Sequence, residues 1–134
     1  MLLFLNLSTE FIHKFLKFGM VGFSGFIIDF GITYLCKEII RIPKYVSNGI
    51  GFLIAATSNY FLNRIWTFQS DNPNVAGEYI EFIFVSIIGL ILNTLIVYLL
   101  SEKLKWNFYF SKVCAIAIVT FWNFFANLYI TFKT

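Results

Sequence analysis

The side chains of this chain that could take part in chemistry are polar groups set within long apolar segments. Prominent among them are Asp29, Asn59, Asn63, Asn123 and Asn127. The asparagines form two pairs spaced four residues apart, and on a helix this spacing places both amides of a pair on one face. Because lipid offers these groups no hydrogen-bond partner, each should bind another helix or a substrate. The pattern predicts either interhelical hydrogen bonds or a polar path across a membrane.

Asp29 has two interpretations. As a functional group it would be a substrate or proton site, and as a structural group it would be a protonated or hydrogen-bonded packing residue. Gly25 lies one turn before it and Gly22 about two turns before it, on the same face, and small residues mark places where helices approach closely. We therefore expect Asp29 to face protein rather than lipid.

Lys17 and Arg64 form a second candidate group, because they lie near the ends of two apolar segments that should reach the same membrane interface. Arginine suits phosphate because its planar guanidinium donates paired, charge-assisted hydrogen bonds. The alternative is that both long side chains simply extend to lipid headgroups. The pair is therefore a candidate binding site for an anion.

No catalytic group accompanies these residues. The sequence has no nucleophile–base pair, no glycine-rich phosphate loop and no metal-ligand spacing. Its two cysteines, Cys36 and Cys114, lie in apolar segments, and its single histidine, His13, has no His or Cys partner nearby. We expect a protein that is not an enzyme and that needs neither a metal nor a cofactor.

The composition is that of a membrane protein. Hydrophobic residues make up 59% of the 134 residues and charged residues 13%, against roughly 45–50% and about 25% in soluble domains. A soluble fold of this size could not bury so many apolar side chains. The net charge of +3 comes from basic residues at segment ends, which suits lipid headgroups and not nucleic acid.

Four apolar segments must position the polar groups, at 15–36, 45–66, 79–100 and 109–130. Each has about 22 residues, or about 33 Å of helix, which spans a hydrocarbon core of about 30 Å. Because lipid tolerates no unpaired backbone groups, each segment should be a transmembrane helix. Residues 1–14 are too short to span and should form an interfacial lead-in segment. The predicted fold class is all-α, an integral membrane four-helix bundle.

The chain also contains an internal repeat. Residues 15–68 align without a gap with residues 79–132, at an offset of 64, and sixteen of the 54 aligned positions are identical. This divides the chain into repeat 1 (15–68), a linker (69–78) and repeat 2 (79–134). With two helices in each copy, both copies enter the membrane from the same side, so the repeats are parallel and both termini share one face.

The second copy differs from the first at three candidate positions: Asn93 replaces Asp29, Glu81 replaces Lys17, and Leu128 replaces Arg64. Asn93 is close in shape to an aspartate but cannot titrate, which favours a shared structural role with one specialised copy. The loss of both cations favours a single anion site over two.

Basic residues give a weak indication of orientation. The face that holds the termini carries four of them: Lys14, Lys17, Arg64 and Lys133. The opposite face carries six: Lys37, Arg41, Lys44, Lys103, Lys105 and Lys112. Since cytoplasmic loops are enriched in Lys and Arg, this count slightly favours termini outside the cytoplasm.

The chain resembles the GtrA-like family of small four-helix membrane proteins through two stretches, FLKFGMVGFSGFIIDFGITYLC at 15–36 and SNYFLNRIWTF at 58–68. The residues that carry the resemblance are Lys17, Phe18, Val21, Gly22, Gly25, Asp29, Asn59, Asn63, Arg64, Trp66, Thr67 and Phe68. The second copy repeats the pattern more loosely through Gly89, Asn93, Asn123, Asn127 and Phe132.

The resemblance implies a role in cell-surface polysaccharide synthesis, such as teichoic acid glycosylation in the cell wall. Members of this family are thought to move polyprenyl-phosphate-linked sugars across the cytoplasmic membrane, as a flippase, or to assist a glycosyltransferase. We expect no glycosyltransferase domain in this chain, so a glycosyltransferase would be a separate membrane partner. The resemblance also implies cytoplasmic termini, and we follow it in preference to the narrow charge count.

On this interpretation the cations bind the lipid phosphate and the other polar groups bind the sugar. The expected substrate-binding residues are Lys17, Asp29, Asn59, Asn63, Arg64, Asn93, Asn123 and Asn127. Two alternatives stay open, a proton-coupled exporter resembling the small multidrug-resistance proteins and a membrane anchor for a glycosyltransferase that does not itself transport. A homo-oligomer is also compatible with the sequence, since four helices enclose little volume.

Overall fold

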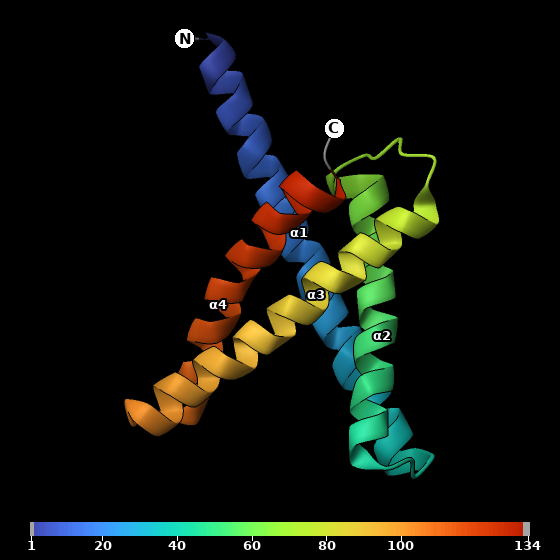
Figure 1. Cartoon of the computed structure of the whole chain (residues 1–134), viewed down its shortest axis with the longest axis vertical. Coiled ribbons are helices and arrows are strands. Elements are labelled where there is room, and N and C mark those ends of the chain that lie inside the picture. The colour runs from blue at the N-terminus through green and yellow to red at the C-terminus, as the bar shows by residue number, and fades with distance from the viewer. Residues whose placement is uncertain (1, 133–134) are drawn as a thin grey trace. The chain divides into compact units, whose positions relative to one another are not determined.

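The computed structural model describes residues 2–132, and the described chain is helical throughout apart from short connections (Figure 1). Its four α-helices are α1 (Leu2–Tyr34), α2 (Lys44–Leu62), α3 (Val75–Tyr98) and α4 (Phe108–Ala126). Each continues into one π-helical turn: η1 (Leu35–Ile39), η2 (Asn63–Thr67), η3 (Leu99–Lys103) and η4 (Asn127–Thr131). The predicted all-α class is confirmed.

The chain divides into two compact units, Met1–Asp71 and Asn72–Thr134. Each is an antiparallel helical hairpin, α1 with α2 in the first unit and α3 with α4 in the second (Figure 1). The division falls inside the expected linker, 69–78. The helix bounds confirm short connections within each hairpin, because only four residues separate η1 from α2 and η3 from α4.

The buried aromatic residues follow the internal repeat. Phe18 of α1 packs edge-on against Phe68 after η2, with ring centroids 6.2 Å apart. Phe82 and Phe132, which lie 64 residues further along, repeat this contact at 6.1 Å. Tyr60 and its counterpart Phe124 are completely buried as well. The two hairpins are therefore closed by equivalent contacts at the ends away from their loops.

The π-helical turns give every helix the same kind of ending. The N–H of Ile40 donates to the carbonyl of Leu35, and in the second unit the N–H of Leu104 donates to Leu99 in the same way. The chain then turns through a residue with a left-handed backbone, at Arg41, Gln69 and Lys105. Two of these, Arg41 and Lys105, again differ by the repeat offset of 64.

The residue before the second helix of each hairpin, Pro43 in the first and Asn107 in the second, helps to start that helix. Pro43 precedes α2, where its missing N–H leaves no unpaired donor. Its counterpart Asn107 precedes α4 and accepts a hydrogen bond from the N–H of Phe110 at 3.2 Å. α3 begins in a similar way, since Asn74 accepts from the N–H of Gly77 at 3.1 Å.

Three stretches of the described chain are long and apolar enough to cross a membrane: Thr9–Ile39, Val75–Lys103 and Phe110–Thr131. α2 is not among them, although it pairs with α1 along its length. Its 19 residues include Lys44, Ser47, Asn48, Ser58 and Asn59, which lower its hydropathy. Together with η2 it has 24 residues, or about 36 Å, so its length matches a bilayer even though its composition is more polar.

The first helix begins earlier than the sequence analysis predicted. α1 runs unbroken from Leu2 past residue 14, the expected end of the lead-in segment. The reason is local, because residues 2–18 contain neither glycine nor proline and nothing stops the helix there. The predicted interfacial position of residues 1–14 remains a prediction.

Candidate functional site

Asn59 and Asn123 are packed against glycines of the neighbouring helix. The amide of Asn59 fills the space that a Cβ atom at Gly25 would occupy, and Asn123 does the same at Gly89. Both side-chain oxygens are buried and accept no hydrogen bond. Because the arrangement recurs in both hairpins, it is a helix-packing seam in each, and Gly25 is confirmed as a point of close approach.

Gly22, expected on the same packed face, is not packed. No atom lies within 4 Å of the position where its Cβ would be, and the residue is exposed. The prediction that both glycines mark the contact was wrong for Gly22. Close approach between α1 and α2 begins one turn later, where Asn59 needs the room at Gly25.

Asn63 and Asn127 are buried inside the π-helical turns. The hydroxyl of Thr67 donates to Oδ1 of Asn63 at 2.7 Å, and Thr131 donates to Oδ1 of Asn127 at the same distance. In the second hairpin Nδ2 of Asn127 also donates to the carbonyl of Asn123 at 2.7 Å. These amide oxygens are occupied within their own turns. Their side-chain oxygens thus have hydroxyl partners, whereas those of Asn59 and Asn123, which share a helix face with them by spacing, lie against glycines.

The cations Lys17 and Arg64 lie at the same end of the first hairpin. Nζ of Lys17 lies 5.4 Å from the centroid of the Trp66 ring, two residues from Arg64. Arg64 is half-buried and donates from Nη1 to the hydroxyl of Ser70 at 3.4 Å. The nearby contact between Phe18 and Phe68 fixes this end of the hairpin. We call Lys17, Arg64 and Trp66 the cationic end of unit 1.

The second hairpin keeps the scaffold of this end and lacks its charged group. The aromatic pair and the asparagine–threonine bond are both present. In place of the three residues of the cationic end, however, stand Glu81, Leu128 and Ile130. The difference separates residues that hold the turn from residues that are specific to one copy.

Asp29 lies in a second group that is specific to the first hairpin. The hydroxyl of Thr33 donates to Oδ1 of Asp29 at 3.2 Å. Gly51 of α2 closes on the pair, since a Cβ there would overlap both Thr33 and the Asp29 carboxylate. Asp29 therefore faces protein on one side, as expected, while the side chain stays half exposed.

Asn93 takes the place of Asp29 in the second hairpin, without the same surroundings. Val97 stands where Thr33 would be and the buried Ala115 stands where Gly51 would be. The side-chain oxygen of Asn93 is buried and accepts no hydrogen bond. Only the first copy therefore has an accessible carboxylate beside a hydroxyl at this depth.

Comparison with known proteins assigns the chain to a family. The family described as GtrA/DPMS, transmembrane domain, matches residues 17–132, which is most of the chain. The chain belongs to this family. The match covers both hairpins and so includes every predicted site residue.

Relatives of this GtrA/DPMS domain protein include two from Listeria. The cell wall teichoic acid glycosylation protein GtcA of Listeria monocytogenes is 25% identical over 128 residues, covering 93% of this chain and 88% of the relative. GtcA of Listeria innocua matches to the same extent. The dolichol-phosphate mannosyltransferase of Pyrococcus furiosus is 26% identical over 90 residues, covering 66% of this chain and only 25% of that longer protein.

Two features of this GtrA/DPMS domain protein were not predicted from its sequence. Trp66 was named from the sequence only among the residues that carry the family resemblance, although it contacts Lys17. Glu78 was not considered. Its side chain is fully buried in the first turn of α3, where an acidic residue interacts favourably with the positive end of the helix dipole. Copy-by-copy comparison could have indicated Trp66, since the second repeat has Ile130 there.

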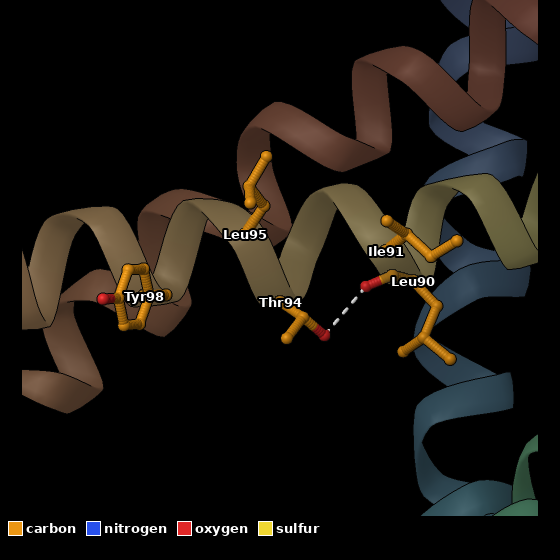
Figure 2. Close-up of a pocket in the computed structure, with 5 residues that line it drawn as sticks. All are labelled: Leu90, Ile91, Thr94, Leu95 and Tyr98. Carbon is orange, nitrogen blue, oxygen red and sulfur yellow. Dashed lines mark hydrogen bonds between the residues drawn. The ribbon is translucent and has the colours of Figure 1, made fainter.

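One further surface feature of the second hairpin is apolar. A shallow depression of about 550 Å³ lies along α3 and is lined by Leu90, Ile91, Thr94, Leu95 and Tyr98 (Figure 2). The hydroxyl of Thr94 turns back to the carbonyl of Leu90 at 3.0 Å, so it adds little polarity. Among residues 2–132, no group of three or more His, Cys, Asp or Glu side chains could hold a metal ion.

Proposed function

We propose that this protein moves polyprenyl-phosphate-linked sugars across the cytoplasmic membrane for glycosylation of a cell-surface polysaccharide, teichoic acid being the class suggested by its relatives. The observation that carries the proposal is the cationic end of unit 1, which is present in one repeat only. The names of the relatives support the substrate class, since one concerns teichoic acid glycosylation and another a glycosyl transfer that involves a prenyl phosphate.

The chemistry of such a lipid fits the residues of the first hairpin. Its isoprenoid tail can stay in the hydrocarbon, while its phosphate needs cations at an interface. Lys17 and Arg64 supply these, and the guanidinium suits paired hydrogen bonds to phosphate oxygens. Asp29 and Thr33 offer hydrogen-bonding groups deeper in the hairpin, which lowers the cost of taking a polar headgroup out of water.

We further propose that the chain does not catalyse glycosyl transfer itself and that a separate membrane glycosyltransferase makes or uses its substrate. The mannosyltransferase relative supports this, because the aligned part covers a quarter of that protein. In this proposal transport is facilitated, and it is driven by a gradient or by consumption of the sugar on the far side.

The proposal is tested by reconstituting the purified protein in vesicles that carry a labelled polyprenyl-phosphate sugar. We expect the protein to speed movement of the label between leaflets. Lys17→Glu and Arg64→Leu, which introduce the residues of the second copy, should slow it. Glu81→Gln and Leu128→Ile are the matched controls in the second hairpin and should leave the rate unchanged. No movement above protein-free vesicles would refute transport and support the anchor function.

Asp29 beside Thr33 specifically favours the other alternative, the proton-coupled exporter, because a carboxylate inside a membrane helix can carry a proton. That function predicts export of cationic dyes driven by a pH gradient and abolished in Asp29→Asn. Our proposal predicts no dye export in wild-type vesicles. It also predicts loss of surface polysaccharide glycosylation, without drug sensitivity, when the protein is deleted from cells.

A further inference from the structure

Trp66 is held outward on a fixed turn. The two residues that follow it, Thr67 and Phe68, are buried, and so is Asn63 at the start of the same turn, while Ile65 is exposed. The bond from Thr67 to Asn63 and the packing of Phe68 on Phe18 hold the turn on both sides of the indole. Trp66 itself is 42% exposed. A large aromatic ring is therefore presented at a defined position at the end of the hairpin.

The ring lies directly beside a cation that can bind phosphate. Nζ of Lys17 is 5.4 Å from the ring centroid, within the range of a cation–π contact. In a polyprenyl-phosphate sugar the sugar is bonded to the phosphate through a single oxygen atom. A phosphate drawn to Lys17 and Arg64 must therefore carry its sugar to within a few ångströms of this end of the hairpin, where Trp66 presents an exposed aromatic surface.

We propose that Trp66 is the platform on which the sugar of the bound lipid stacks. This inference rests on the proposed function. The C–H bonds on one face of a pyranose ring carry partial positive charge, and they pack on the negative face of an indole as an ammonium group does. When the phosphate attracts Lys17, the ammonium leaves the ring face and the sugar replaces it. Trp66 thereby makes the protein bind the glycosylated lipid more tightly than the bare lipid phosphate.

The second repeat shows that the turn does not require tryptophan. Ile130 stands at the corresponding position of η4, half exposed, and the asparagine–threonine bond beside it is intact. Trp66→Ile should therefore fold, and it is the natural control for loss of the π surface. If Trp66 were only an interfacial anchor, as tryptophan often is in membrane proteins, the attached sugar would make no difference to it.

The experiment compares binding of a short-chain polyprenyl phosphate, bare or carrying one neutral hexose, to the full chain in detergent. Affinity is measured by titration, and Trp66 emission is taken as the wild-type fluorescence minus that of Trp66→Ile. We expect the wild type to bind the hexose-bearing lipid about two- to tenfold more tightly than the bare lipid, the range of one stacking contact. We also expect the two lipids to change Trp66 emission differently, because the bare phosphate only draws the Lys17 ammonium from the ring, whereas the hexose also covers the ring.

Trp66→Ile should bind both lipids with the affinity that the wild type has for the bare one, and Trp66→Phe should keep part of the preference. A thermal unfolding midpoint equal to that of the wild type shows that each variant is folded. The inference is overturned if folded Trp66→Ile keeps the full preference for the hexose-bearing lipid. If the wild type binds neither lipid, the proposed function fails, and this inference fails with it.

Discussion

At the scale of single residues, Asn59 and Asn123 show how a polar group inside a membrane helix can be explained by packing. Each amide occupies the space beside a glycine, and its buried oxygen accepts no hydrogen bond. Contacts between an oxygen and backbone Cα–H groups are common where helices meet, and they compensate in part for the missing bond. Since both copies keep the pair of Gly and Asn, the arrangement belongs to the scaffold.

This explanation predicts that Gly25→Ala destabilises the protein by about 1–3 kcal/mol, because the added methyl overlaps the Asn59 amide. Thermal unfolding in detergent, followed through reaction of the buried thiol of Cys36, measures the loss. Much of it should be recovered in the double variant Gly25→Ala/Asn59→Ala, since the clash is with the end of a side chain. Gly22→Ala is the control and should leave the midpoint unchanged or slightly raised, because its methyl meets no neighbour. An equal loss at both glycines would contradict the explanation.

The residue types of the site could be predicted from the sequence, and their partners could not. Asp29 was identified because a carboxylate is rare inside an apolar segment. Lys17 and Arg64 were identified because they lie near segment ends at one interface and because the second copy has no cation at either position. The indole beside Lys17 and the hydroxyl beside Asp29 were not, since both depend on how the side chains of a folded hairpin meet. Asn59 and Asn63 share a helix face by spacing, yet a change to a π-helical turn at residue 63 gives them different surroundings.

At the scale of helices, the π-helical turns explain why the same short motif closes each hairpin. A π-helical turn widens the helix by one residue and is often found at functional sites. In η2 and η4 it allows an asparagine to turn inward and accept from the threonine four residues later. Arg64 and Trp66 lie between these two residues in η2, so the buried bond holds the turn that carries them.

We therefore expect Asn63→Leu to lower stability by about 1–2 kcal/mol, because it removes the buried hydrogen bond from Thr67. Asn127→Leu should lower it by at least as much, because it removes the bond from Thr131 and also the bond to the carbonyl of Asn123. Their effects on function should differ. Binding of a polyprenyl phosphate should weaken in Asn63→Leu, which loosens the turn of the cationic end, and should persist in Asn127→Leu. Unfolding midpoints and lipid titrations on the same samples check both statements. Equal loss of binding in the two variants would show that the site involves both turns.

The existence of the four helices followed from apolar segment length, because a helix must reach across the bilayer and only helices can do so without unpaired backbone groups. The residues at which the helices begin and end could not be predicted from segment length. The structure extends α1 back to Leu2 and ends every helix in a π-helical turn. Hydropathy carries no information about such endings, which depend on local hydrogen bonds and on left-handed residues such as Arg41 and Lys105.

At the scale of the whole molecule, we propose two hairpins that each enter and leave the membrane, which would put both termini on one face. This topology predicts that the connections after η1 and η3 lie on the other face, together with the six basic residues counted there. Following the family resemblance, we propose that the termini are cytoplasmic, against the small excess of basic residues on the opposite face. A single count of charges is a weak argument when the difference is six to four.

Cysteine labelling in intact cells tests the topology. In a background with Cys36→Ala and Cys114→Ala, we expect a membrane-impermeant maleimide to label Ile40→Cys and Leu104→Cys, two exposed positions after η1 and η3. Asp71→Cys, in the connection between the units, should react only after the cells are opened. The reverse pattern would place the termini outside, and labelling of Ile40→Cys and Leu104→Cys from opposite sides would refute parallel repeats.

The central claim is that the first repeat alone binds the phosphate of an isoprenoid lipid, on a scaffold that both repeats share. Its most direct test is a titration of the purified chain with a short-chain polyprenyl phosphate, read as stoichiometry and affinity. We predict one lipid per chain, with affinity lowered about tenfold or more by Lys17→Glu or Arg64→Leu, as for loss of a charge-assisted hydrogen bond. Glu81→Gln and Leu128→Ile should bind as the wild type does. Two lipids per chain, or undiminished binding when Lys17 and Arg64 are both replaced, would contradict it.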